Sequence, residues 1–190
     1  MSDEFSEELS RIEARASAAP PPWLAVLEVE PIDGFEPYGR KLREIARAAV
    51  SVARDEEFDA DELDASGVPR WFADLTDGRD ADSGGIPASS HQGSADYYQA
   101  RGEREWDVQE WLFCFEPELR RWSWWDLTTP DGRRAFIWID TRGEAVIPAE
   151  ELWWAAFASG ARSVSGLVMK TGEEWARQPS AGILQTGESS

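Results

Sequence analysis

The sequence predicts an α+β fold: an antiparallel sheet of about four to five strands, with helices packed mainly on one face and an additional N-terminal helix. Short segments rich in aromatic residues and separated by turn residues predict the strands. Segments with apolar residues at helical spacing precede and interrupt them. Hydrophobic residues make up 42% of the 190 residues, which is enough for a core. We expect one domain over 20–178, an acidic helical appendage over 1–19 and a disordered tail over 179–190.

The N-terminal part is predicted to contain a helix over 3–18 and a strand over 23–30. Apolar residues in the first segment recur at i, i+4, i+7 and i+11, which is helical spacing: Phe5, Leu9, Ile12 and Ala16. This stripe is thin, so the helix is expected to pack weakly or to await a partner. Three prolines, 20–22, force extended backbone between the two elements. Apolar and acidic residues then alternate at the end of the strand.

The clearest predicted helix covers 37–54 and is the one basic element of the chain. Its cations are Arg40, Lys41, Arg43, Arg47 and Arg54. Their simplest neighbour is the acidic run that follows. A short amphipathic turn is expected at 69–75. Residues 76–95 are rich in Gly, Ser and Asp and predict a long loop, mobile or functional, without a periodic element.

The second half of the chain predicts most of the sheet. Strands are expected over 106–115, 121–128 and 133–140, with a Pro-Asp-Gly turn joining the last two. A helix over 149–159 and a final strand over 163–169 follow. One alternative stays open at the first of these strands, since three of its residues also fit one helical face: Trp106, Glu110 and Cys114.

The charge of the chain contrasts with its aromatic content. It carries 37 acidic against 19 basic side chains, a formal charge of −18, and 11 tryptophans, most of them between Trp106 and Trp154. Such acidity disfavours direct contact with DNA or RNA, whose affinity for proteins comes largely from phosphate contacts. The N-terminus does not resemble a signal peptide and no apolar stretch is long enough for a membrane span, so a cytoplasmic protein is expected.

The strongest candidate for a partner-binding site is the segment 55–64, hereafter the acidic segment. Seven of its ten residues are acidic: Asp55, Glu56, Glu57, Asp59, Asp61, Glu62 and Asp64. It could be a solvated connector after the basic helix, a docking face for a cationic partner, or a calcium site. Calcium is disfavoured because the spacing is wrong and the run contains no glycine. Asp77, Asp80 and Asp82 in the following loop form a second candidate group for the same partner, and they also miss the calcium-loop pattern.

Two tryptophans are predicted to anchor the partner. Alternation along the strand 121–128 places Trp122 and Trp124 on one face and Trp125 on the other. Trp153 and Trp154 point about 100° apart on a helix, so one of them is expected to be buried and the other at least partly exposed. Trp125 and Trp154 are therefore the candidate aromatic anchors, with core packing as the plainer alternative.

Residues suited to catalysis are few. Asp126, Asp140 and Glu144 could cluster at strand ends and serve acid–base chemistry. His91 is the only histidine and Cys114 the only cysteine, so neither has a partner of its own kind for a metal or disulfide site. Cys114 is expected to be a buried hydrophobic residue. We predict no metal and no cofactor.

These observations favour binding over chemistry. The sequence predicts an acidic cytoplasmic module that neutralises or escorts a basic protein, most concretely an immunity-type inhibitor of a bacterial toxin. One alternative is a nucleic-acid mimic that inhibits a DNA-binding protein. Another is a small carboxylate-dependent enzyme. An adaptor that uses residues 1–19 for its partner is the last, and it predicts that their deletion abolishes binding but leaves the fold intact.

Overall fold

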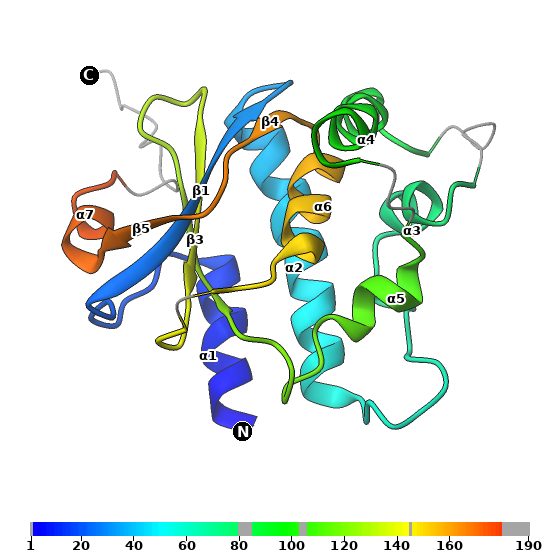
Figure 1. The fold of residues 1–190 in the computed structure, drawn as a ribbon, viewed down its shortest axis with the longest axis horizontal. Helices are drawn as coiled ribbons and strands as arrows, with labels where there is room; N and C mark the ends of the chain where they lie inside the picture. The colour runs from blue at the N-terminus through cyan, green and yellow to red at the C-terminus, as the bar shows by residue number, and fades with distance from the viewer. Residues whose placement is uncertain (1, 80–84, 103–105, 145, 180–190) are drawn as a thin grey trace, which may run out of the picture.

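A computed structural model describes residues 2–79, 85–102, 106–144 and 146–179 (Figure 1). Over these ranges it confirms the predicted α+β fold, with one antiparallel sheet of five strands. The strands are β1 (Trp23–Pro31), β2 (Ser123–Thr128), β3 (Ala135–Asp140), β4 (Ala161–Val164) and β5 (Val168–Thr171). They lie in the order β2-β3-β1-β4, and β5 pairs with the first half of β1 beside β4.

Helices surround the sheet mainly on one side (Figure 1). They are α1 (Ser2–Glu13), α2 (Phe35–Asp55), α3 (Arg70–Thr76), α4 (Ala88–Arg101), α5 (Val108–Phe113), α6 (Glu150–Ala158) and α7 (Gly172–Ala176). The predicted strand 23–30 and the predicted helices 37–54 and 149–159 are confirmed as β1, α2 and α6, with ends shifted by one or two residues.

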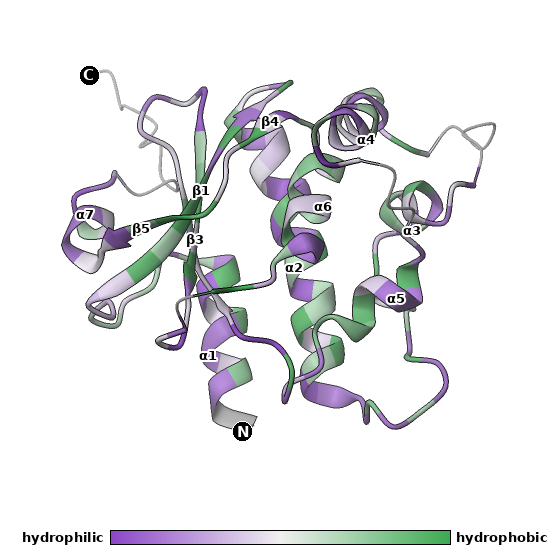
Figure 2. Cartoon of the chain, in the orientation of Figure 1, coloured by the Kyte–Doolittle hydropathy of each residue, from purple (hydrophilic) through white to green (hydrophobic). Residues whose placement is uncertain are grey.

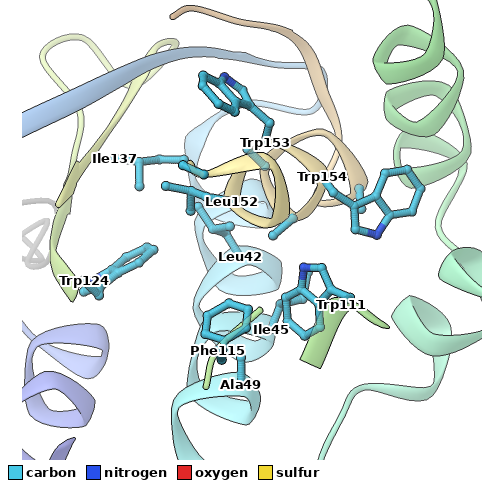
Figure 3. Close-up of a cluster of buried hydrophobic side chains, with 14 of the residues drawn as sticks. Leu42, Ile45, Ala49, Trp111, Phe115, Trp124, Ile137, Leu152, Trp153 and Trp154 are labelled. Atoms are coloured by element: carbon cyan, nitrogen blue, oxygen red, sulfur yellow. The ribbon is translucent and has the colours of Figure 1, made fainter. Parts of the chain in front are cut away.

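The main core lies between the sheet and the helices α2, α5 and α6 (Figure 3). Alternate residues of β1 and β3 face it, among them Leu27 and Ile137, which are opposite each other in register. Leu42 and Ile45 of α2 and Leu152 of α6 are buried in the same cluster. Period-2 alternation in the strands and a helical stripe in α2 thus meet in one apolar layer.

A smaller cluster lies on the opposite face of the sheet, where α7 covers it. Trp138 of β3, Trp125 of β2 and Trp175 of α7 form its centre. A β-bulge between Trp124 and Asp126 interrupts the pairing with β3, yet Trp124 and Trp125 still lie in different clusters, as alternation predicts. The short helix α7 was not predicted, although its capping box of Thr171 and Glu174 is readable in the sequence.

The N-terminal helix α1 closes the free edge of β2. Glu8 is completely buried, and its carboxylate accepts the backbone N–H of Trp124 at 2.6 Å and forms an ion pair with buried Arg120. Arg11 donates from Nε to the Trp124 carbonyl at 3.1 Å. Phe5 and Ile12 are buried in the main core. The helix ends at Glu13 rather than at residue 18, but its thin apolar stripe is supplemented by buried polar contacts, so it packs closely on the sheet.

The predicted strand 106–115 is wrong, because residues 108–113 form helix α5. Asp107 caps this helix by accepting the Glu110 N–H at 2.8 Å. Val108, Trp111 and Leu112 are its buried residues, at i, i+3 and i+4. The helical alternative at this segment was therefore correct in type, although the buried face differs from the one named.

The predicted loop 76–95 is wrong over its last part, where α4 begins at Ala88. The buried face of α4 consists mostly of small residues, Ser89, Ser90 and Gly93, followed by Tyr97. Hydrophobic periodicity cannot detect such a face. His91, expected in a loop, is an exposed residue of this helix.

The predicted final strand 163–169 is two strands. β4 pairs with the end of β1 and β5 with its beginning, and both pairings are antiparallel. The other two predicted strands, 121–128 and 133–140, are confirmed as β2 and β3.

Candidate functional site

The acidic segment leaves the end of α2 and crosses the surface as a loop with fixed attachment points. Phe58 packs edge-to-face on Phe113 of α5, with ring centroids 6.0 Å apart. Leu63 is buried, and its backbone is held at both ends by the side-chain amide of Gln109: the Leu63 N–H donates to Oε1 at 2.8 Å, and Nε2 donates to the Leu63 carbonyl at 3.0 Å. A segment without regular secondary structure is therefore tied to the fold at two apolar residues.

Around these attachments the carboxylates face solvent. Asp59, Asp61 and Glu62 are exposed, as is Glu57, and Glu56 is partly exposed. None of these five forms an ion pair with the described part of the chain. The negative charge here is thus left for the solvent or for a partner.

The two ends of the acidic segment differ from its middle. Arg54 binds Asp55 through two hydrogen bonds of 2.7 Å, which lower the pKa of that carboxyl. Asp64 accepts the backbone N–H and the hydroxyl of Ser66, and these bonds lower its pKa as well. Both end carboxylates therefore stay ionised, and Asp64 also fixes the local backbone through the Ser66 N–H.

The basic residues of α2 do not cover the acidic segment, contrary to the simplest expectation. Of these basic residues of α2, Arg54 alone forms an ion pair with the described acidic segment, at the hydrophilic lower end of α2 in Figure 2. Lys41 binds serines of α4, Arg43 donates to the Leu127 carbonyl at 3.4 Å, and Arg47 lies 3.8 Å from Glu13 of α1. Three cations of α2 therefore contact α4, the sheet and α1 instead of the acidic segment: Lys41, Arg43 and Arg47.

The second acidic candidate group is only partly described. Asp77 accepts the Val108 N–H at 2.8 Å and binds Arg79 at 2.6 Å, so it joins the end of α3 to the start of α5. Asp80 and Asp82 lie outside the described residues.

Both candidate aromatic anchors are buried. Trp154 is fully enclosed and donates from Nε1 to the Thr76 hydroxyl at 3.0 Å. Trp125 packs edge-to-face on Trp175, and the Arg11 guanidinium lies 5.1 Å from its ring centre. In this conformation both rings serve the core and neither offers a surface to a partner.

The exposed tryptophan is Trp23, which sequence reasoning did not single out. It is 58% exposed at the start of β1. Met169 is exposed on the neighbouring strand β5, two pairs further along the register and on the same face. Trp23 directly follows three prolines and is the first residue of β1. This position was the available signal of its exposure.

The carboxylates proposed for catalysis have separate partners. Asp126 is buried and accepts from Trp175 Nε1 at 2.8 Å and from the Leu127 N–H, while its burial raises its pKa. Asp140 accepts the Arg142 N–H in a turn, and Glu144 lies 3.9 Å from Arg121 on the surface. Their contacts are those of packing and turns.

Sequence reasoning missed a buried polar cluster of Glu8, Arg120 and Glu151. Trp122 donates from Nε1 to Glu151 at 2.7 Å, yet burial raises the pKa of Glu151 to about 7. Arg120 binds Glu8 and lies 5.3 Å from the centre of the Trp122 ring. Its Nε and Nη1 have no hydrogen-bond partner in the described protein. The ion pair of Glu8 and Arg120 joins residues more than a hundred positions apart. A local sequence pattern therefore cannot predict this cluster.

No three His, Cys, Asp or Glu side chains among the described residues converge to hold a metal ion. Cys114 is partly exposed, and its thiol lies 3.4 Å from the Glu110 carbonyl. Within the described ranges, every helix is too short or too polar to cross a membrane.

Comparisons with protein-family models, with curated proteins and with solved structures give no match.

Proposed function

We propose that this protein binds a basic protein partner through the acidic segment and thereby neutralises or escorts it. The observation that carries the proposal is the row of exposed carboxylates without an ion-pair partner in the described chain, on a loop that Phe58 and Leu63 attach to the fold. An immunity-type inhibitor of a bacterial toxin is the concrete form of this function.

Charge and rigidity act together in such a site. Clustered negative charge speeds the approach of a cationic surface and favours the correct orientation. A loop already attached to the core loses less conformational entropy on binding than a free one. The buried positions of Trp125 and Trp154 leave the carboxylates as the main contribution, so we expect an association that weakens strongly with salt.

The test compares two variants with the same change in charge. The first neutralises the middle of the acidic segment: Glu57→Gln, Asp59→Asn, Asp61→Asn and Glu62→Gln. The control neutralises exposed carboxylates elsewhere: Glu30→Gln, Glu118→Gln, Glu144→Gln and Glu173→Gln. Each is used to capture partners from a lysate of the source organism, followed by mass spectrometry and by stopped-flow association with the purified partner.

We expect one basic protein to bind the unmodified chain and the control, with association at least tenfold slower for the first variant. Equal capture by both variants would contradict the proposal. Displacement of the chain by DNA would favour the nucleic-acid mimic, since the partner's target would then be DNA.

A further inference from the structure

A second polar constellation, remote from the acidic segment, lies where α4 meets the N-terminal half of α2 (Figure 1). Lys41 of α2 donates from Nζ to the Ser89 hydroxyl at 2.8 Å and lies 3.4 Å from the Ser90 hydroxyl. Ser89 is almost completely buried, yet it lines a surface pocket of about 580 Å³. Lys41 does not line this pocket itself and contacts Ser89 from behind the pocket wall. A serine hydroxyl held by an amine is the arrangement of an activated nucleophile.

Two glycines make this contact possible. Gly160 has φ of +97°, and a Cβ there would lie 3.0 Å from both Lys41 Nζ and the Ser89 hydroxyl. At Gly93 of α4, a Cβ would lie 1.9 Å from the Phe157 carbonyl oxygen, so α4 can approach α6 this closely only with glycine. The missing side chain of Gly160 leaves the space in which the amine meets the hydroxyl, and that of Gly93 lets α4 pack closely on α6.

The pocket also supplies hydrogen-bond donors for a developing negative charge. Ala88 and Ser89 are the first two residues of the 14-residue helix α4. Their N–H groups precede the first bond of the helix, which the Ser90 N–H makes with the Pro87 carbonyl. Amides at a helix N-terminus stabilise an oxyanion, and Ala88 lines the same pocket as Ser89.

Apart from Ile32, the remaining lining of the pocket is polar. Asp33, Gln92, Asp96 and Arg162 contribute to it. Burial lowers the pKa of Lys41, whereas the charge of Asp33 acts in the opposite direction. A larger fraction of this amine is therefore neutral, and able to accept a proton, than of an exposed lysine.

We propose that Ser89 is the nucleophile of an acyl-transfer site, with Lys41 as its base and a small ester or thioester with a polar acyl group as its substrate. The Ser89 oxygen bonds to the carbonyl carbon while its proton passes to the free amine of Lys41. The bond to the alcohol or thiol then breaks with its electron pair, and this leaving group takes the proton from the Lys41 ammonium. Water repeats the sequence on the acyl-serine: its oxygen bonds to the carbon, its proton passes through Lys41, and Ser89 leaves as the hydroxyl.

The experiment uses the full chain and an alkyl fluorophosphonate, which forms a serine–phosphorus bond with loss of fluoride. Intact mass and peptide mapping should show one adduct, on Ser89. Ser89→Ala should abolish it. Lys41→Arg keeps a cation and a donor but removes the base, so labelling should slow at least tenfold. Ser163→Ala changes an exposed serine on β4 and should label like the unmodified chain.

The dependence of labelling on pH separates a base from a merely structural lysine. The rate should rise with a midpoint below 10.5, in the direction of the lowered pKa. Thermal unfolding of each variant shows whether it is folded, and the site of the adduct on the unmodified chain decides the proposal even if a variant is not. Absence of an adduct, an adduct elsewhere, or unchanged labelling of folded Lys41→Arg would overturn it.

Discussion

The carboxylates of Glu8 in α1 and Glu151 in α6 are chemically like those of the acidic segment and have the opposite role. Glu8 and Glu151 are nearly inaccessible to solvent, and each is held by a tryptophan: Glu8 by the Trp124 N–H and Glu151 by the Trp122 indole. In the acidic segment, Asp59 and Asp61 are exposed, and neither forms an ion pair with the described residues. Burial makes a carboxylate part of the fold, and exposure leaves its charge free to act over a distance.

This difference has a physical basis in the dielectric environment. A charge removed from water must be compensated nearby, so the loss of one partner is costly. An exposed charge is screened, contributes little to stability and is effective mainly on the approach of another charged surface. Changes to the buried carboxylates should therefore lower the free energy of unfolding much more than changes to the exposed ones.

The largest loss of stability is expected for Glu8→Ala. It leaves the Arg120 charge and the Trp124 N–H buried without their partner, which costs about 3–5 kcal/mol in the free energy of unfolding. Glu4 lies on the same helix as Glu8, and Glu4→Ala removes its surface ion pair with Arg142. This change should cost less than about 1 kcal/mol in the free energy of unfolding. Urea unfolding followed by tryptophan fluorescence measures both. Equal losses would show that the burial of Glu8 is not what matters.

The second comparison is the pH dependence caused by Glu151. The pKa of Glu151 is raised from 4.5 to about 7, so between these values the folded protein holds a proton that the unfolded chain has released. The stabilisation from this group is fully present below pH 4.5 and is lost as the pH rises through 7, by up to about 3 kcal/mol.

Glu151→Gln should therefore flatten the fall in unfolding free energy between pH 5 and 8. Glu150→Gln, one residue away and paired with Arg101 at the surface, removes only the smallest contribution to the pKa of Glu151 and should flatten this fall far less. The raised pKa of Asp126 adds a fall of the same sign in all three proteins, so the comparison isolates Glu151. A slope that survives in Glu151→Gln would contradict this assignment.

The third comparison concerns the attachment of the acidic segment. Gln109→Ala removes both hydrogen bonds to the Leu63 backbone and should cost roughly 1–2 kcal/mol. Amide hydrogen exchange should accelerate at Leu63. Gln99→Ala, an exposed position of α4, is the matched control and should change neither quantity. Unchanged exchange in Gln109→Ala would mean that the loop is held by its apolar contacts alone.

The smallest effect on stability is expected where the charge is densest. The fourfold neutralisation at Glu57, Asp59, Asp61 and Glu62 should change the unfolding free energy by less than about 0.5 kcal/mol, because each carboxylate is exposed. The same variant should show the largest change in association with a basic partner. A marked loss of stability would indicate that these side chains have a role in the fold.

Local patterns predicted the elements whose burial is apolar and regular. The stripe of α2 and the alternation in β1 and β3 are visible in the sequence because hydrophobic residues mark the buried side. The start of α4 was predicted as a loop because its buried face contains Ser89, Ser90 and Gly93. Serine and glycine are typical of loops, so their burial in a helix is not visible in the sequence. In α5, aromatic residues suggested a strand, although Asp107 is a helix cap.

The candidate site was predictable in part. The acidic segment was identified by composition alone, and its exposure follows from the same composition. The fate of the tryptophans was not predictable, since rings that suit an interface suit a core equally well. The ion pair of Glu8 and Arg120 joins positions 112 residues apart and could come only from the three-dimensional structure.

The attachment of α1 to the edge of β2 also has a consequence for biosynthesis. A ribosome releases Glu8 and Arg11 long before Trp124, so this helix cannot reach its final place until most of the chain has emerged. Closing so long a loop slows folding, and until then the outer edge of β2 can pair with strands of other chains. Helix α1 is thus synthesised before the strand whose edge it covers, and aggregation competes with folding until it docks.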